Sequence, residues 1–312
     1  MRSYYRVMLG RKSAHAELCL KGGFIGADFG VEQDLSNSLA LDWKEFGRKV
    51  APVYAANRPD KSKIAAGLAC GALWTIGKGM QPGDIVLAPD GEGSYHAGEV
   101  IGHYSYVAGQ PLPHRRPIRW LNVVIPRQNM SEGLLGSASV PLTVVGPNAI
   151  TAHAEEIETL IVAGPTTSTS PSDPNQPSTE NNFALEKHLE EFLVSNWKST
   201  ELGQEYDIYD GGDGLVGQQL QTDTGPLDIL AISKDKRRLL VVELKKGRAA
   251  DAVVGQILRY MGYVKEELAE TDQAVLGVII ARDDDSRLQR ALSMVPAVSF
   301  YRYQVSFRLH KG

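Results

Sequence analysis

Three side chains in two neighbouring strand-like segments carry the chemistry that this sequence predicts. Asp228 lies in the alternating run 227–232, and Glu243 and Lys245 lie in the apolar run 239–245 that follows a charged connection. Because successive side chains of a strand point to opposite faces, Glu243 and Lys245 share a face, and a hairpin between the runs brings Asp228 close to both. Burying two carboxylates and an ammonium is costly unless the charges are paired or bind a metal.

Oxygen ligands from Asp228 and Glu243 suit Mg²⁺, which typically uses one or two carboxylates and keeps several waters. Mn²⁺ accepts the same donors. Lys245 would then orient or help to deprotonate an attacking water and offset charge that develops on phosphorus. The three residues therefore predict metal-dependent hydrolysis of a phosphodiester. The alternative is a structural salt bridge at the end of a strand.

A helix expected over residues 249–268 supplies two further candidates. Gln256 and Tyr260 are four residues apart, so they lie on neighbouring turns of one face. They would hold a phosphate, a water or a metal ligand, and the alternative is a polar seam of an amphipathic helix. The other elements expected in this half are a helix at 183–197, strands at 206–209, 215–220 and 274–281, a helix at 287–294 and a strand at 298–309.

This order, a helix, three strands, a helix and a strand with Asp…Glu-x-Lys on the second and third strands, resembles the PD-(D/E)xK nuclease superfamily. The likeness is greatest to the branch of mismatch-type endonucleases and defence-associated nucleases. It rests on three segments, which are GPLD at 225–228, VELKKG at 242–247 and GQILRY at 255–260. The resemblance implies an α/β nuclease core of the order αβββαβ.

The resemblance also implies roles for individual residues. It assigns metal ligation to Asp228 and Glu243, the part of the catalytic lysine to Lys245, and the helix motif beside the site to Gln256 and Tyr260. Members of the superfamily also use a glutamate on the first helix at the metal. Glu186 is favoured for this place over Glu190, which lies one turn further along the same predicted helix.

Composition divides the chain and limits its class. Residues 164–182 contain no aliphatic or aromatic side chain and cannot bury apolar area to offset the entropy of ordering, so a disordered linker is expected there. It would separate a domain at 1–163 from a domain at 183–312. No apolar run approaches the roughly 18–20 residues of a membrane helix. The two cysteines, Cys19 and Cys70, exclude a disulfide framework, and a cytoplasmic location is expected.

The N-terminal half predicts short strands joined by glycine-rich turns, a pattern typical of a small barrel. Helices are expected from about 34–36, at 48–56 and at 62–73. Five elements of this half resemble PUA-like domains, and within them the EVE-type readers of modified bases. They are GGFIG at 22–26, Trp74, PGDIV at 82–86, GEVIG at 98–102 and RRPIRW at 115–120. The resemblance implies an α+β domain that recognises a modified base in DNA.

A base that is taken out of a duplex needs aromatic faces to stack on and polar groups for its edge. The stacking candidates are Phe24, Phe29 and Trp74, the acceptors for an exocyclic amine are Asp28 and Asp90, and the phosphate contacts are Arg115, Arg116 and Arg119. The alternatives are core packing for the aromatic residues and an exposed strand end for the arginines. The net charge of −4 excludes a uniformly basic surface but leaves room for a local cationic groove.

The sequence thus predicts a Mg²⁺-dependent endonuclease that cuts double-stranded DNA near a modified base and restricts foreign DNA. Cutting both strands needs two active sites, so a homodimer is expected. No phosphate-binding loop is present, so no ATP requirement is expected, and no membrane is involved. Two alternatives stay open: a repair endonuclease for mismatches or damage, and a non-catalytic nucleic-acid-binding protein with a nuclease-like fold.

Overall fold

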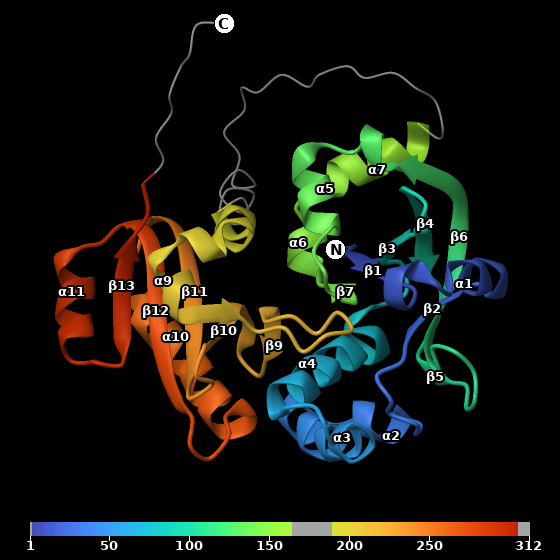
Figure 1. Cartoon of the computed structure of the whole chain (residues 1–312). Helices are drawn as coiled ribbons and strands as arrows, with labels where there is room; N and C mark the ends of the chain where they lie inside the picture. The colour runs from blue at the N-terminus through green and yellow to red at the C-terminus, as the bar shows by residue number, and fades with distance from the viewer. Residues whose placement is uncertain (1, 164–188, 305–312) are drawn as a thin grey trace, which may run out of the picture. The chain divides into compact units, whose positions relative to one another are not determined.

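A computed structural model describes residues 2–163 and 189–304 of the chain (Figure 1). The chain forms two compact units. Within the described residues, the first comprises 2–163 and Asp210–Val216, and the second comprises 189–209 and 217–304. The short segment Asp210–Val216 belongs to the first unit although it lies between two strands of the second, a feature that no pattern in the sequence reveals. The predicted linker at 164–182 lies outside the described residues.

The first unit is built around a curled sheet in the order β2-β6-β4-β3-β1-β7, with β5 paired to β6. Only β1 and β3 run parallel among these pairings. The strands are β1 (Tyr4–Val7), β2 (Phe24–Ala27), β3 (Ile85–Pro89), β4 (Ser94–Val100), β5 (Ser105–Tyr106), β6 (His114–Pro126) and β7 (Val144–Val145). The short strands predicted for this half are present, while the PUA-like assignment of this sheet stays a prediction.

Seven α-helices and three shorter helical turns accompany this sheet in the described part of the first unit. They are α1 (Ala16–Gly22), α2 (Ser36–Leu39), α3 (Trp43–Asn57), α4 (Lys63–Trp74), α5 (Glu132–Ala138), α6 (Pro147–Thr151), α7 (Ala154–Ala163), η1 (Arg11–Ser13), η2 (Thr75–Gly79) and η3 (Arg127–Asn129). Helix α3 begins before the predicted residue 48, because the Asp42 side chain accepts a hydrogen bond from the Glu45 backbone N–H and caps the helix there. Ser62 caps α4 in the same way.

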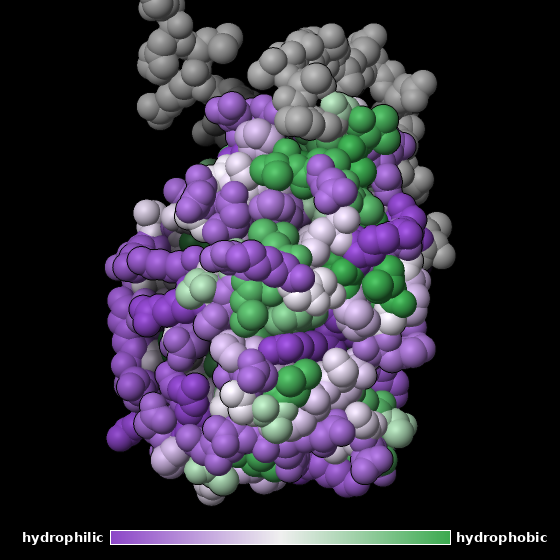
Figure 2. Space-filling model, turned by 90° about the vertical axis from the view of Figure 1, so that its right-hand side faces the viewer, coloured by the Kyte–Doolittle hydropathy of each residue, from purple (hydrophilic) through white to green (hydrophobic). Residues whose placement is uncertain are grey.

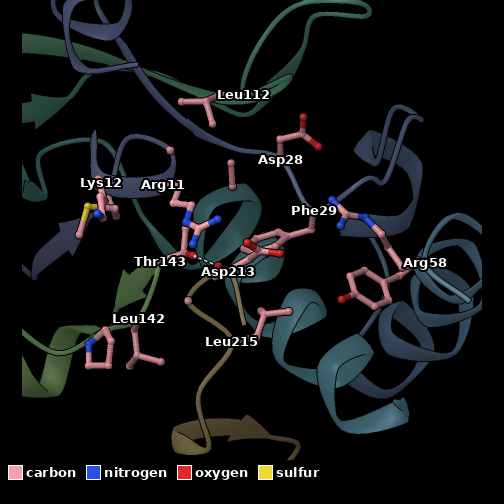
Figure 3. A pocket seen from close by; sticks show the side chains of 16 residues that line it. Arg11, Lys12, Asp28, Phe29, Arg58, Leu112, Leu142, Thr143, Asp213 and Leu215 are labelled. Carbon is pink, nitrogen blue, oxygen red and sulfur yellow. Dashed lines mark hydrogen bonds between the residues drawn. The ribbon is translucent and has the colours of Figure 1, made fainter. Parts of the chain in front are cut away.

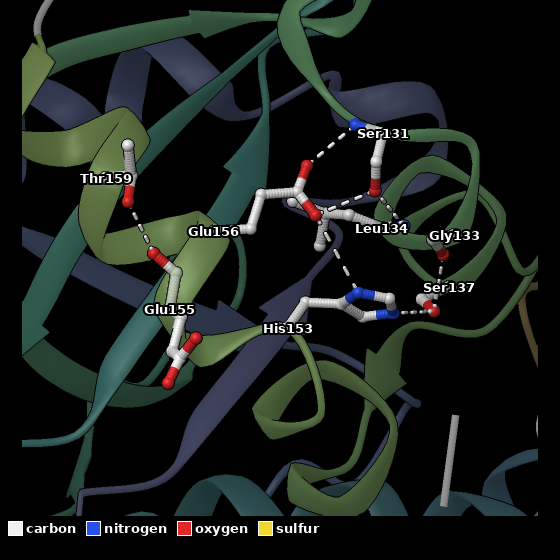
Figure 4. A network of polar contacts seen from close by, with 8 residues as sticks. All are labelled: Ser131, Gly133, Leu134, Ser137, His153, Glu155, Glu156 and Thr159. Carbon is white, nitrogen blue, oxygen red and sulfur yellow. Dashed lines mark hydrogen bonds and ion pairs between the residues drawn. The ribbon is translucent and has the colours of Figure 1, made fainter. Parts of the chain in front are cut away.

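A polar network joins α5 to α7 in the first unit (Figure 4). The Ser137 hydroxyl lies 3.1 Å from Nε2 of His153, whose Nδ1 lies 3.8 Å from Oε2 of Glu156. Glu156 also accepts hydrogen bonds from the backbone N–H and the hydroxyl of Ser131, at 2.6 and 2.7 Å. Serine, histidine and glutamate in this order match a hydrolase triad. However, Ser137 is 0% exposed, so its hydroxyl cannot reach a substrate and the network is structural.

His114 is a buried histidine of the first unit with a hydrogen-bond partner at each ring nitrogen. Its Nε2 lies 2.7 Å from the Val31 carbonyl and its Nδ1 lies 2.8 Å from the Tyr104 hydroxyl. A carbonyl only accepts, so Nε2 carries a proton. The Tyr104 hydroxyl accepts from the Leu35 backbone N–H at 3.2 Å and can donate its own proton to Nδ1. Burial lowers the pKa of His114, and this outweighs the hydrogen bond to Val31 and the charges of Asp28 and Asp34, which raise it.

We expect the free energy of unfolding of the first unit to fall as the pH decreases below about 6.5, the ordinary pKa of histidine. The unfolded chain then binds a proton on His114 that the folded chain resists, so protonation favours unfolding. Urea denaturation at pH 7.5 and pH 5.5 measures the change. His114→Gln should reduce this pH dependence, and an equal dependence in the variant and the parent would contradict the assignment.

The second unit is built around a mixed sheet in the order β13-β12-β11-β10-β8, with β9 paired to β10. Its strands are β8 (Tyr206–Ile208), β9 (Gln218–Thr222), β10 (Gly225–Ser233), β11 (Arg238–Arg248), β12 (Ala274–Asp283) and β13 (Val298–Arg302). Its helices are α9 (Glu201–Glu205), α10 (Ala252–Tyr263) and α11 (Ser286–Ser293), with the shorter turns η4 (Trp197–Ser199) and η5 (Val264–Leu268), and residues 189–195 are also helical.

The core of the second unit contains Trp197, Ile229, Val242 and Val278. The predicted strands at 227–232, 239–245 and 274–281 lie within β10, β11 and β12, and the predicted helix at 287–294 corresponds to α11 within one residue at each end. In the helical segment 189–195, Phe192 is 67% exposed whereas Leu189 and Leu193 pack on the core.

The surface does not present one continuous apolar face in the view of Figure 2. Hydrophobic residues there form several groups with hydrophilic residues between them. Large exposed apolar side chains of the first unit include Leu18, Ile101, Val124 and Val162. Among the described residues, no helix has both the length and the apolar character needed to cross a membrane.

Candidate active site

Strands β10 and β11 bring Asp228 beside the Glu243–Lys245 segment. The strands pair antiparallel with Ile229 opposite Val242, so the next pair in register is Asp228 opposite Glu243. Oδ2 of Asp228 accepts a hydrogen bond of 2.8 Å from the backbone N–H of Leu244. The carboxylate is therefore held directly against β11, and the predicted hairpin register is the observed one.

Glu243 and Lys245 form an ion pair on β11. Nζ of Lys245 lies 2.7 Å from Oε1 of Glu243. Glu243 is 2% exposed and Lys245 is half-buried, so the pair has one end in the protein interior and one end within reach of solvent. A buried carboxylate is costly without compensation from a cation or hydrogen bonds, and the neighbouring ammonium supplies part of it here.

Gln219 connects a third carboxylate to Asp228. Its Nε2 lies 2.7 Å from Oε2 of Glu190 and 3.3 Å from Oδ1 of Asp228. Gln219 has a φ of +47°, a left-handed conformation that is uncommon outside glycine, and it lies on β9 across from Asp228 on β10. Glu190, the second candidate for the glutamate of the first helix, thus lies at the site. Glu186, the favoured candidate, lies outside the described residues.

Helix α10 adds a polar pair to this site. Nε2 of Gln256 donates to the Tyr260 hydroxyl at 3.3 Å, one turn along the helix as predicted. Burial raises the pKa of Tyr260, the hydrogen bond from Gln256 lowers it, and the negative charges of Glu243 and Asp228 raise it further. The phenol is therefore a neutral hydrogen-bond donor that lies within the electrostatic field of the two carboxylates.

The donor set suits a hard divalent cation. Asp228 and Glu243 offer carboxylate oxygens from adjacent strands, and Mg²⁺ needs only one or two protein carboxylates because it retains water ligands. Among residues 2–163 and 189–304, no group of three or more His, Cys, Asp or Glu side chains is arranged to hold a metal. Asp228 and Glu243 would leave the remaining coordination positions of such a cation to water.

The part of the chain that carries this site matches a known nuclease domain. Residues 187–293 match the endonuclease NucS C-terminal domain. The matched segment contains Asp228, Glu243, Lys245, Gln256 and Tyr260. Residues 5–141 match a domain of unknown function, DUF8426. No curated protein matches the chain.

Solved structures of nucleases also resemble the chain. A complex of EndoMS with double-stranded DNA is 14% identical and has a TM-score of 0.33, and the match covers 69% of this chain and 62% of that chain. A repair endonuclease from Pyrococcus abyssi is 14% identical with a TM-score of 0.31, over 69% of this chain and 66% of that chain. The chain thus spans less than two thirds of the length of either structure.

The residues that were predicted to read a base do not form a single cluster in the first unit. Phe29 and Asp28 line one cavity. Trp74 instead packs edge-on against Trp43 and Phe46, with ring centroids 5.5 and 5.0 Å away.

The Phe24 ring lies 3.9 Å from the guanidinium carbon of Arg115. Asp90 accepts hydrogen bonds from the backbone N–H groups of Glu92 and Ser94, in the turn between β3 and β4.

The three arginines that were predicted to contact phosphates also differ from one another. Arg116 is 2% exposed, so burial keeps its guanidinium from a phosphate at the surface, which corrects that prediction. Alternate residues of β6 face opposite sides, and Arg116 is on the buried side. Arg115 is half-buried and donates to the carbonyls of Pro111 and Leu112. Arg119 is exposed and pairs with Glu99 at 2.6 Å.

Replacing Glu190 by glutamine should lower the rate of DNA cleavage by about 10- to 100-fold, the usual effect of losing a group that orients a metal ligand. The substitution removes a charge beside Gln219 and Asp228 and conserves volume. Single-turnover cleavage assays compare Glu190→Gln with Glu191→Gln, a neighbouring helical glutamate, as the matched control. If Glu191→Gln lowers the rate and Glu190→Gln does not, the assignment of Glu190 to this site is wrong.

Proposed function

We propose that the chain is a Mg²⁺-dependent endonuclease that hydrolyses phosphodiester bonds of double-stranded DNA. The observation that carries this proposal is the meeting of Asp228, Glu243 and Lys245 on two adjacent strands of the segment that matches the endonuclease NucS C-terminal domain. Two carboxylates with a lysine beside them form a site for phosphodiester hydrolysis, whereas a solely structural ion pair would not need the second carboxylate.

Asp228 and Glu243 would hold the metal, with Glu190 and Gln219 orienting Asp228 from the other side. When bound, Mg²⁺ supplies polarisation of the phosphodiester and lowers the pKa of a coordinated water. The ammonium of Lys245 stabilises negative charge on the phosphoryl oxygens and orients the attacking water. The neutral hydroxyl of Tyr260, fixed by Gln256, donates a hydrogen bond to a phosphate oxygen or a water.

The first unit would select the DNA on which this site acts. The resemblance of the second half of the chain to mismatch-type endonucleases favours a repair role, in which the substrate carries a mismatch or damage. The cavity that Phe29 and Asp28 line favours restriction of DNA that carries a modified base, since an aromatic face and a carboxylate are suited to a flipped base. In both cases two copies of the chain are needed to cut both strands, so we propose a homodimer.

Cleavage of matched duplexes tests the proposal. Duplexes of one sequence are prepared unmodified, with a single mismatch, and with modified cytosine or adenine, and each is incubated with Mg²⁺ or with EDTA. Selective cutting of the mismatched duplex supports repair, and selective cutting of a modified duplex supports restriction. The reactions are repeated with Mn²⁺ in place of Mg²⁺. If no duplex is cut with either ion, the proposal is contradicted, and undiminished cutting in EDTA contradicts the metal requirement.

A further inference from the structure

The first unit contains a cavity of about 500 Å³ that lies outside the proposed nuclease site (Figure 3). Segments far apart in the sequence form it: the turn of η1, the end of β2, the end of α3, the segment before β7, and the loop Asp213–Leu215. The loop is fixed to the wall because the Thr143 hydroxyl donates to the Asp213 carbonyl at 3.2 Å and the Thr143 N–H donates to the Gly214 carbonyl at 3.3 Å. The volume is in the range of small-molecule sites.

The cavity has an apolar lining and a charged rim. Its apolar and aromatic lining includes the buried residues Phe29, Tyr54, Leu112, Leu142 and Leu215. The exposed side chains of Arg11, Lys12, Asp28 and Asp213 lie around it, with the half-buried Arg58. An amphipathic ligand with a flat apolar part and an anionic part matches this division, whereas a bare anion would leave the apolar lining without a partner.

The backbone of Gly30 determines where the Arg58 side chain lies. Gly30 has a φ of +75°, and a Cβ built there would lie 3.0 Å from Nε of Arg58. The adjacent Asn57 amide donates to the Gly30 carbonyl at 2.6 Å, which ties the end of α3 to this turn. A side chain at position 30 would therefore displace the guanidinium, and glycine allows it to lie against the backbone at the rim of the cavity.

A strained turn presents the other two cations. Lys12 and Ser13 both have positive φ, at 54° and 60°, a conformation that is uncommon outside glycine. Within residues 2–163 and 189–304, no ion pair or side-chain hydrogen bond engages the cationic groups of Arg11, Lys12 or Arg58. Figure 3 shows Arg11 and Arg58 on either side of Phe29 in this view.

Extending the base-reading role proposed above for this cavity, we infer that it binds one phosphorylated nucleoside, with the base against Phe29 and the phosphate among Arg11, Lys12 and Arg58. An aromatic ring offers stacking to any base, and arginine guanidinium groups bind phosphate through paired hydrogen bonds. Asp213 accepts from the exocyclic amine or the sugar hydroxyl. The ligand is either a free nucleotide or one nucleotide of a strand, because both present the same base and phosphate.

Calorimetric titration of the full chain with AMP, GMP, CMP and TMP tests this inference. Mononucleotides contain no internal phosphodiester, so their binding is measured separately from cleavage, and failure of the proposed nuclease function would leave this result unaffected. We expect at least one nucleotide to bind at least tenfold more tightly than ribose 5-phosphate or inorganic phosphate. Arg58→Ala and the double variant Arg11→Ala/Lys12→Ala should each weaken that binding at least tenfold.

Two further variants separate specific contacts from general effects. Lys21→Ala removes an exposed lysine of α1 that pairs with Glu17 outside the cavity, and it should bind as the parent does. Phe29→Leu keeps apolar volume, so it should fold, but it should lose the preference for a nucleotide over ribose 5-phosphate. Failure of all four nucleotides to bind, equal binding of ribose 5-phosphate, or unchanged affinity in both cationic variants would overturn the inference.

A short single-stranded oligonucleotide, added in EDTA, then identifies the source of the ligand. Competition between the oligonucleotide and the bound mononucleotide supports a site for one nucleotide of a strand. Binding of the mononucleotide without such competition supports a site for a free nucleotide. Both outcomes retain the chemistry assigned to the cavity, and thermal unfolding of each variant confirms that the first unit is folded.

Discussion

Asp228→Asn is expected to lower the rate of DNA cleavage by about a thousandfold or more, comparable to the loss of a main electrostatic contact in an active site. The asparagine oxygen can still accept the hydrogen bond from the Leu244 N–H, so the strand arrangement is conserved. The negative charge that would hold a divalent cation is lost. Lys245→Met should produce a loss of similar size, because the methionine keeps the length of the side chain but removes the ammonium beside Glu243.

Single-turnover cleavage of a duplex in excess enzyme measures these effects, and DNA affinity is measured separately without a divalent ion. Asp283→Asn is the matched control, since this carboxylate lies at the end of β12 and pairs with Arg282. We expect the control to cut as the parent does and both site variants to retain their fold. Cleavage by Asp228→Asn and Lys245→Met at the parent rate would show that the hydrolytic site lies elsewhere.

The central part of this site could be predicted because its geometry is determined by residues that are close together in the sequence. The alternating run 227–232 and the apolar run 239–245 are joined by a short charged connection. Only one pairing register of these two runs keeps their apolar side chains inside the protein. That register brings Asp228 opposite Glu243. The four-residue spacing of Gln256 and Tyr260 was sufficient in the same way, because one helical turn determines their contact.

The remainder of the site depends on tertiary contacts that no local pattern encodes. Gln219 lies at an irregular point of β9 with a positive φ, and nothing in its sequence neighbourhood predicts that its amide links Glu190 to Asp228. The faces of β6 posed a related difficulty. Consecutive arginines looked like a basic cluster, but the strand turns Arg116 inward while Arg119 stays exposed. A net count of charges cannot distinguish these environments.

The second large effect that we expect is on stability. Gly203→Ala should lower the free energy of unfolding of the second unit by about 3 kcal/mol or more, which is at the upper end of the cost of overpacking. A Cβ at this position would lie 1.9 Å from the carbonyl oxygen and 2.6 Å from the carbonyl carbon of Trp197. Both are backbone atoms. The Trp197 oxygen also accepts from the Thr200 hydroxyl, and the indole N–H donates to the Tyr206 carbonyl, so the segment cannot move without breaking these bonds.

Urea denaturation followed by tryptophan fluorescence measures this change, because Trp197 is buried in the affected core. Gly262→Ala is the control: this glycine lies in α10, and no heavy atom lies within 4 Å of the added Cβ. Alanine is favoured over glycine in a helix by about 1 kcal/mol, so the control should stabilise the unit slightly. The same chemical change thus has opposite effects at the two positions, and a Gly203→Ala variant as stable as Gly262→Ala would contradict the close approach at Trp197.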